Sequence, residues 1–410
     1  SYYHSLAEPY VWTDGYTGDA HTLMRLIADG TSTEELHWDL PMQGWLSPPF
    51  EDYYQFHFDS EKLNAYLLKR CIEAGIKVID AEVVDTVLDQ NGFVDYVVDS
   101  TNAKHHADFF IDSSGFKRVI ASKLGAEWVD WSKYLPMNSA IAFQTPYEEK
   151  IPPYTLSKAM DAGWHWRSPV QDRFGNGYVF SDQFISEDEA VNEIQKHFTD
   201  TINIGRKINF VSGKVNKFWI KNCVSIGLSS NFVEPLEASS ISTTIQQSRA
   251  LAGSLATWDR NDTGTIKEYN KTFDDCLSNV LDFIQLHYFT QRNDTKFWQW
   301  CNNEITMTDF NKENIEMFKT NFVNQVLLPE DGTHGSFRIY DCLNWIQVMH
   351  GLRMFDQKNI KKLYESRYSH YRTQDIQQLD QLPQTTTGGT WLTCRQAVDS
   401  IKGKGITYSL

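Results

Sequence analysis

The chain has 410 residues, 14% of them aromatic, and a formal net charge of -15 from 38 Lys and Arg against 53 Asp and Glu. This acidic balance, without a basic stripe, argues against nucleic acid or an anionic membrane as partner and favours a small molecule. The six cysteines lack paired spacing and no apolar run is long enough to span a membrane, so we expect a cytoplasmic protein without a disulfide framework.

The first predicted elements are a helix and a β-meander. In DSEKLNAYLLKRCIEAG the apolar residues recur at helical spacing, and Asp59 or Ser60 is the expected N-cap. Residues 77–115 then alternate as strands do, with a hairpin turn at Asn91-Gly92 and a last strand in FFIDSSG. A helix followed by a meander indicates an α/β layer.

A second sheet, mostly antiparallel, is predicted at about residues 135–185, with strands at 138–144, 163–169 and 177–181. The letters FGNG are placed in the loop that joins the last two of these strands. Further along, KNCVSIG predicts another strand that ends on glycine.

The strand GWHWRSP carries Trp164 and Trp166, which share one face with Ser168 because side chains alternate along a strand. The two indoles then form an aromatic wall on that face. Such a wall is most often part of a core, since each buried indole needs only one partner for its N–H. The pair alone therefore does not decide between packing and function.

The segment VSIGLSSNFVEPLEASSI, residues 224–241, combines a strand that ends at Gly227, a loop of small residues, and a helix N-terminus expected around residues 236–240. The free N–H groups of a first helical turn and the helix dipole together make an anion site. Glu237 lies in that turn, where the dipole stabilises a carboxylate whether or not it has a further role.

Long helices are predicted from about Ser239 onward. In TGTIKEYNKTFDDCLSNVLDFIQ the apolar residues recur at three and four, and Thr265 with Glu268 forms a capping box. The polar and biased segment 374–389 predicts a loop.

Four of these motifs, FFIDSSG, GWHWRSP, FGNGYVFS and SIGLSSNFVEPLEASSI, resemble in order and spacing the flavin-dependent halogenases of the tryptophan-halogenase type. HYFTQRNDTKFW resembles the helical half of that family, and the resemblance runs from His4 to about Gly351. It implies an α/β plus α fold. An FAD-binding, monooxygenase-like mixed-sheet domain with the second antiparallel sheet would cover residues 1–250, and a helical C-terminal subdomain would cover 251–410.

The resemblance also implies a reaction. Reduced FAD, supplied by a separate flavin reductase, and O2 convert chloride, bromide or iodide to hypohalous acid, which travels through a short tunnel to an electron-rich, indole- or phenol-like aromatic. Trp164 and Trp166 would wall that tunnel and keep the substrate away from the flavin. Glu237 matches the catalytic carboxylate, which orients the halogenating species or takes the ring proton.

Further residues are assigned by the same resemblance. Ser239 and Ser240 would bind halide through their backbone N–H groups, and His4 and Phe232 would border the tunnel and the substrate. The residues matched to FAD binding are Asp112, Ser113, Gly115, Gly227, Ser229, Ser230, Pro235 and Ile241. The histidines show no HxH or HExxH spacing, so no metal is expected.

The chain departs from the family pattern in several places. It shows no GxGxxG fingerprint and no matching catalytic lysine, and it begins without Met, so we expect that an N-terminal portion of the natural protein is missing. Ser168 and Ser240 replace an isoleucine and a glycine that are usual in the family. PEDGTHGSFRIYDCLNW lacks the family's aromatic clamp, so free tryptophan is not the expected substrate.

Two alternatives stay open. A flavin-dependent hydroxylase on a related fold would transfer oxygen directly, and its product would not depend on halide. A degenerate relative without FAD would use the aromatic cleft for binding or assembly only, as the missing fingerprint and lysine suggest. The sequence also leaves open whether the chain forms a homo-oligomer.

Overall fold

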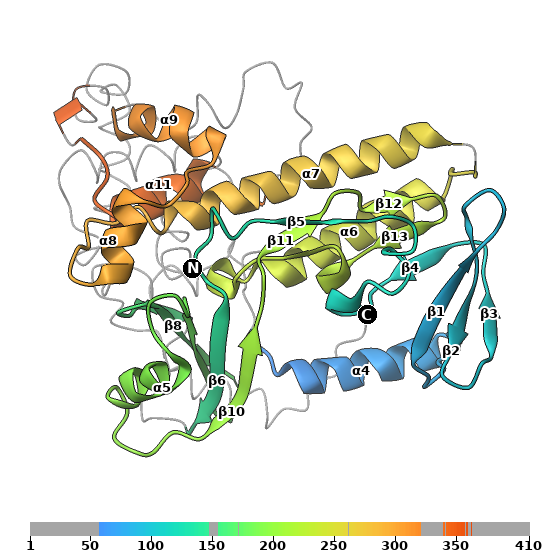
Figure 1. Ribbon diagram of the computed structural model, residues 1–410, viewed down its shortest axis with the longest axis horizontal. Coiled ribbons are helices and arrows are strands. Elements are labelled where there is room, and N and C mark those ends of the chain that lie inside the picture. The colour runs from blue at the N-terminus through green and yellow to red at the C-terminus, as the bar shows by residue number, and fades with distance from the viewer. Residues whose placement is uncertain are drawn as a thin grey trace, which may run out of the picture.

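The computed structural model describes residues 57–146, 155–170, 172–260, 262–320, 339–340, 342–356, 358–359 and 362. His4 and the loop predicted at 374–389 lie outside these residues. Figure 1 shows the arrangement: the long helix α7 crosses the molecule, a large sheet lies below one end of it, and a meander lies at the other end.

The helix and meander predicted at the start of the described chain are confirmed. Helix α4, Ser60–Glu73, begins at the N-cap Asp59, whose carboxylate accepts from the N–H groups of Glu61 and Lys62. Strands β1 (Val83–Leu88), β2 (Val94–Asp99) and β3 (Lys104–His106) follow as an antiparallel sheet, with the hairpin turn at Asn91-Gly92. The β pattern was predicted to begin near Lys77, which is wrong, because the first strand starts only at Val83.

The second sheet contains five antiparallel strands in the order β10-β6-β9-β8-β7. These strands are β6 (Ser139–Thr145), β7 (Leu156–Ala159), β8 (Gly163–Pro169), β9 (Phe174–Phe180) and β10 (Ile204–Asn209). Helix α5, Glu187–Gln195, packs on one face, where Ala190 and Ile194 join the apolar cluster around Tyr178. The other face joins the main core of the molecule through Trp164 and Val179.

The prediction that FGNG forms a loop is wrong. Phe174–Gly177 is the first half of β9, and the loop that joins it to β8 covers residues 170–173. Glycines normally argue against a strand interior, but here Gly177 pairs directly with Trp166. A Cβ at Gly177 would meet the Trp166 ring at 1.8 Å, so glycine is what lets the indole lie over the strand.

Two smaller sheets connect the meander to the helical half. In the first, β4 (Phe110–Asp112) runs parallel to β13 (Cys223–Ser225), which pairs with β12 (Trp219–Ile220). The second has the order β14-β11-β5, from Asn231–Phe232, Gly213–Val215 and Trp128–Asp130. Because β4 and β13 are parallel, their carboxyl ends, Asp112 and Ser225, lie side by side at one edge.

The later part of the described chain is helical, as predicted. Its helices are α6 (Ser239–Leu255), α7 (Thr263–Leu286), α8 (Lys296–Asn303), α9 (Asp309–Thr320) and α11 (Cys342–Gly351). The predicted capping box is wrong: α7 begins two residues before Thr265, with Asp262 as N-cap accepting from the N–H groups of Gly264 and Thr265. An Asp that reaches two backbone donors competes successfully with the Thr and Glu pair.

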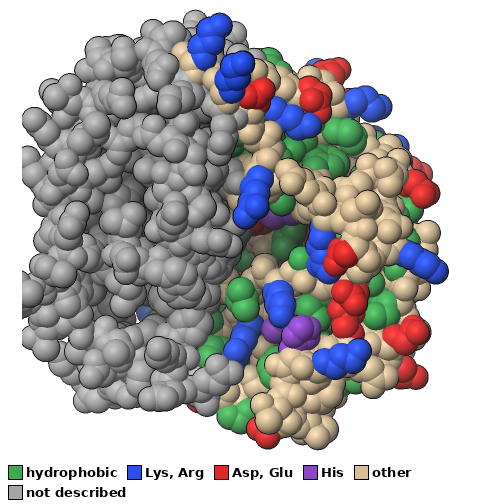
Figure 2. Space-filling view, turned by 90° about the vertical axis from the view of Figure 1, so that its left-hand side faces the viewer, with side chains coloured by type: hydrophobic (Ala, Val, Ile, Leu, Met, Phe, Trp, Pro, Cys, Tyr) green, Lys and Arg blue, Asp and Glu red, His purple; other side chains and the backbone are tan. Residues whose placement is uncertain are grey.

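The described residues thus form a mixed α/β structure. Within these ranges, no helix has both the length and the apolar character needed to cross a membrane. Lys and Arg side chains are interspersed with Asp and Glu over the described part of the face in Figure 2.

Candidate active site

A helix N-terminus follows the sequence VEPLE. Pro235–Glu237 forms a turn of 3-10 helix, Ala238 adopts a left-handed conformation with φ 51°, and α6 begins at Ser239, within the range 236–240 predicted for the helix start. The methyl side chain of Ala238 provides no cap hydrogen bond. The first backbone N–H groups of α6, those of Ser239 and Ser240, are therefore suited to an anion.

Glu237 lies beside this helix start with its side chain only 1% exposed. Its Oε1 is 2.8 Å from Nε2 of His287, the residue directly after α7. The other ring nitrogen of His287, Nδ1, is 2.9 Å from the carbonyl oxygen of Phe283. The Tyr340 hydroxyl donates to the Glu237 carbonyl oxygen, and burial raises the pKa of Tyr340 well above its ordinary value.

These contacts restrict where protons can lie. A carbonyl oxygen can only accept, so His287 Nδ1 carries a hydrogen, and Nε2 faces a carboxyl group. The hydrogen bond between Nε2 and Glu237 then needs one proton, which resides either on the imidazole or on the carboxyl. The two side chains can therefore exchange one proton with each other.

A second glutamate, Glu234, is completely buried three residues earlier. Its Oε1 accepts from the indole N–H of Trp164 at 3.2 Å and from the hydroxyl of Tyr288. Burial raises the pKa of Glu234 to about 7. The consecutive residues His287 and Tyr288 therefore each bind one of the two glutamates.

The faces predicted for GWHWRSP are confirmed. Trp164 is 4% exposed and belongs to the main core, whereas Trp166 is half-buried, and their ring centroids are 6.2 Å apart. His165 points to the opposite face, where it stacks on Phe143 and burial lowers its pKa to about 4. The two indoles thus lie beside each other on one face of β8, and we call this pair the tryptophan wall.

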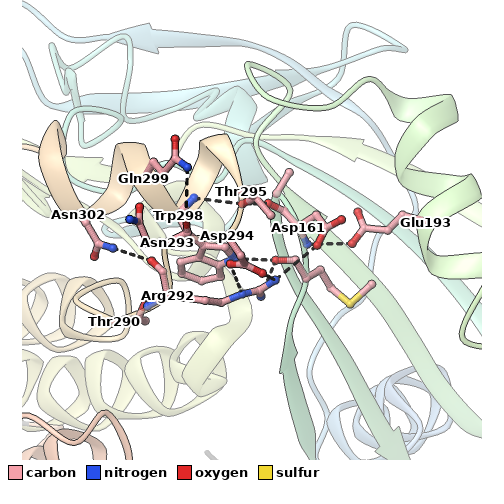
Figure 3. A network of polar contacts seen from close by, with 12 residues as sticks. Asp161, Glu193, Thr290, Arg292, Asn293, Asp294, Thr295, Trp298, Gln299 and Asn302 are labelled. Carbon is pink, nitrogen blue, oxygen red and sulfur yellow. Dashed lines mark hydrogen bonds and ion pairs between the residues drawn. The ribbon is translucent and has the colours of Figure 1, made fainter.

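A polar network fixes the turn just before this wall (Figure 3). The Arg292 guanidinium donates to the Met160 carbonyl at 2.9 Å and pairs with Asp294, and the Trp298 indole donates to the same carbonyl at 2.8 Å. The Thr295 hydroxyl donates to the Asp161 carbonyl at 2.7 Å. The segment HYFTQRNDTKFW therefore holds the end of the β7–β8 hairpin from which Trp164 extends.

The residues matched to FAD binding meet at the edge where β4 and β13 end. Ligands of α/β sheets bind outside the carboxyl ends of parallel strands, and the Asp112 and Ser225 ends lie side by side here. Gly227, with φ +66°, makes the turn after β13 in a conformation that favours glycine. The side chains of Ser229 and Ser230 are fully buried in the following loop.

Asp112 organises this edge through its own hydrogen bonds. Its carboxylate accepts from the N–H and hydroxyl of Ser114, from the Ser229 hydroxyl, and from the N–H groups of Ile120 and Ala121, at 2.7–3.2 Å. With so many donors from the protein, the carboxylate shapes the loop that would receive a ligand.

This edge also contains buried polar atoms that have no hydrogen-bond partner among the described residues, and a polar cofactor could bind to such atoms. Gln247 on α6 is fully buried, and its Oε1 accepts from the N–H of Gly227 and the hydroxyl of Ser230. Its Nε2 and the Ser225 hydroxyl have no hydrogen-bond partner among the residues described. Buried polar groups normally find partners, so these residues fit the polar ring of a flavin.

Other predicted residues are less closely engaged. Ser113, Pro235 and Ile241 are exposed, and Gly115 begins the turn after β4. Phe232 contacts Phe116 and Phe210 at ring distances of 5.4 and 5.0 Å, so it lies on the side of the β4 loop. In the described part of the chain, no group of three His, Cys, Asp or Glu side chains could hold a metal.

Four residues of this arrangement were missed from the sequence: Glu234, Gln247, His287 and Tyr288. Gln247 could have been found, because it falls on the same stripe of α6 as Ser239, Thr243 and Leu251, at spacings of four. His287 and Tyr288 lie far along the chain from Glu237. Only the packing of α7 against the VEPLE segment brings them together.

Comparisons with known proteins agree with these observations. The family model described as tryptophan halogenase matches residues 38–366. ThaL, a tryptophan 6-halogenase of Streptomyces albogriseolus, is 32% identical over 295 residues, which cover 69% of this chain and 55% of ThaL. RebH, a tryptophan 7-halogenase of Lentzea aerocolonigenes, is 33% identical over 314 residues, which cover 73% of this chain and 59% of RebH.

A solved structure is also similar. BrvH, a flavin-dependent halogenase from Brevundimonas sp. BAL3, matches with a TM-score of 0.65 at 28% identity, covering 78% of this chain and 66% of BrvH. The chain spans little more than half the length of the curated relatives ThaL and RebH.

Proposed function

The chain belongs to the tryptophan halogenase family, and from that premise we propose that it halogenates an electron-rich aromatic with reduced FAD, O2 and a halide. The observation that carries the proposal is the Glu237–His287 pair beside the start of α6. In this proposal the carboxyl of the pair transfers protons, and the backbone donors beside it bind the halide. The Trp164 indole is bound to Glu234, three residues before Glu237.

In this proposal FAD binds at the edge formed by β4 and β13. The residues that would hold it are Asp112, Ser113, Gly115, Gly227, Ser229, Ser230, Pro235 and Ile241, joined by Gln247. When bound and reduced, FAD supplies the oxidising chemistry that turns O2 and halide into hypohalous acid. A separate flavin reductase would supply the reduced form.

The residues of the chain perform the remaining steps. The N–H groups of Ser239 and Ser240 hold the halide, and the tryptophan wall keeps the aromatic substrate apart from the flavin. As the ring carbon bonds to the halogen, the oxygen–halogen bond breaks and Glu237 gives its proton to the departing oxygen, which leaves as water. Glu237 then takes the proton from the ring, which restores the one proton of its hydrogen bond with His287.

The proposed substrate is an electron-rich indole or phenol other than free tryptophan, because the segment PEDGTHGSFRIYDCLNW lacks the family's aromatic clamp. A competition assay that offers tryptophan together with a panel of phenols and indoles tests this choice. Efficient, regioselective chlorination of tryptophan would contradict it.

The reaction itself is tested with the protein, FAD, NADH, a separate flavin reductase and either bromide or iodide, with products identified by mass spectrometry. We expect halogenated products that require both the halide and the reductase. Oxygenated products that form without halide would instead identify a hydroxylase. Aromatic binding without turnover under all halides would identify a binding protein.

A further inference from the structure

Glu234 combines several features that packing alone does not require. It is completely buried, and none of the ion pairs of the described residues includes it. Its Oε1 accepts from both Trp164 and Tyr288, while its Oε2 has no hydrogen-bond partner among those residues. A carboxyl group buried without a cation is costly, so its presence beside the tryptophan wall calls for a reason.

Two other buried tryptophans, Trp219 and Trp298, satisfy their indole N–H groups more simply. The Trp219 indole donates to the carbonyl oxygen of Lys221 at 2.9 Å, and the Trp298 indole donates to that of Met160 at 2.8 Å. A backbone carbonyl thus suffices to bury an indole in this core. The carboxyl partner of Trp164 therefore does more than satisfy a donor.

We propose that Glu234 is a positioning residue for halogenation, which holds Trp164 of the tryptophan wall at a fixed place relative to the Glu237–His287 pair. This inference rests on the proposed function for its catalytic consequence only.

The connection between the two sites is short and stiff. Glu234 is followed by Pro235, whose ring fixes φ, and by the 3-10 turn that ends at Glu237. Tyr288 fixes one end of this turn through Glu234, and His287 fixes the other end through Glu237. A shift of Trp164 is thereby coupled to the position of Glu237 through rigid elements.

The hydrogen bond to Trp164 is tested directly by NMR of the full chain with 15N-labelled indoles, in which Trp164→Phe assigns the resonance. We expect Glu234→Leu to speed exchange of the Trp164 indole proton about tenfold or more, because the acceptor is lost. Glu234→Gln keeps an oxygen acceptor and should leave exchange close to wild type.

The catalytic consequence is tested by the share of hypohalous acid that escapes to a thiol trap instead of halogenating the aromatic. We expect Glu234→Leu to raise this share several-fold at unchanged O2 consumption, and Glu234→Gln to restore it. Asp99→Asn is the matched control, because Asp99 is also a buried, hydrogen-bonded carboxyl but lies at the end of β2 in the meander. It should change neither readout.

Two results would overturn the inference: an unchanged Trp164 indole proton in Glu234→Leu, or a released indole without increased escape of hypohalous acid. If the wild-type protein forms no halogenated product, the proposed function fails instead, and the indole measurement still decides whether Glu234 holds Trp164.

Discussion

Glu237 Oε1 lies 2.8 Å from His287 Nε2, although the two residues are fifty positions apart in the chain. The other imidazole nitrogen faces a carbonyl oxygen, so the ring is oriented and its tautomer is restricted. A glutamate that merely stabilised the start of α6 would not need an oriented imidazole. This relationship leads to two predictions about proton transfer.

The first prediction concerns Glu237→Gln, which keeps the shape of the side chain but cannot take up the ring proton. We expect halogenation to slow by about 10²- to 10⁴-fold, the usual contribution of a general acid or base. FAD affinity and O2 consumption should stay near wild type, since neither needs this carboxyl. Product analysis beside an oxygen electrode separates the two steps, and nearly normal halogenation would reduce Glu237 to a helix-end carboxylate.

The second prediction concerns His287→Ala, which leaves a cavity where the imidazole stood. We expect slower halogenation that recovers in part when imidazole is added to the buffer, because free imidazole can take the same place between Glu237 and the Phe283 carbonyl. The wild-type enzyme under the same imidazole concentrations is the control. A loss that imidazole does not reverse would indicate that His287 only supports the fold.

The third prediction uses the two glycines of β9. Gly177→Ala would place a Cβ 1.8 Å from the Trp166 ring, so we expect the indole to move, at a cost of about 1–3 kcal/mol in stability. The displaced wall should let more hypohalous acid escape to a thiol trap.

Gly175→Ala is the matched control, since its Cβ would lie 3.9 Å from its nearest neighbour, the Ser168 carbonyl oxygen. Both variants lose the same glycine flexibility in the same strand. Equal effects of the two substitutions on stability and on escape would show that the position of Trp166 is not what matters.

The fourth prediction concerns pH and stability. Burial raises the pKa of Glu234 from 4.5 to about 7, so between these values the folded protein binds more protons at this group than the unfolded protein does. The contribution of the protonated Glu234 side chain to the free energy of unfolding is therefore fully present below about pH 4.5 and is lost as the pH rises through 7. Relative to Glu234→Gln, the free energy of unfolding of the wild type should fall by up to about 3 kcal/mol between pH 4.5 and 7.

Chemical denaturation at several pH values measures this difference. Tyr288 and Cys301, the titratable groups beside Glu234, have pKa values raised by burial, so neither changes charge in this window. Parallel stability curves for the two proteins from pH 5 to 8 would mean that Glu234 is not the group that titrates.

Local sequence signals predicted much of this fold. The N-cap Asp59, the Asn91-Gly92 turn and the alternation around Trp164 depend on neighbouring residues, and the structure has them as expected. The signal at Phe174–Gly177 misled, because glycines typical of a loop here make room for an indole on the adjacent strand. A close approach of this kind depends on tertiary contacts that a single segment does not contain.

The residues of the candidate site could likewise be predicted from the sequence only in part. Glu237 could be placed at a helix start from its own segment, but its partner His287 could not, because nothing near His287 in the sequence refers to Glu237. Glu234 carries no local signal of burial in the sequence, because glutamates mostly lie on the surface. Its burial follows from the contact with Trp164, seventy residues earlier.

Helix α7 is held by hydrogen bonds near both of its ends. Near its first turns the Asn270 amide bonds to the backbone of Phe218 and Trp219, and directly after its last turn His287 and Tyr288 bind the two glutamates. One residue inserted between these anchors would rotate the far end by about 100° and advance it by about 1.5 Å. Glu234 and Glu237 would both lose their partners at once. The contacts at the two ends therefore fix the length and the helical phase of α7 together, and this constraint does not depend on which side chains lie between Asn270 and His287.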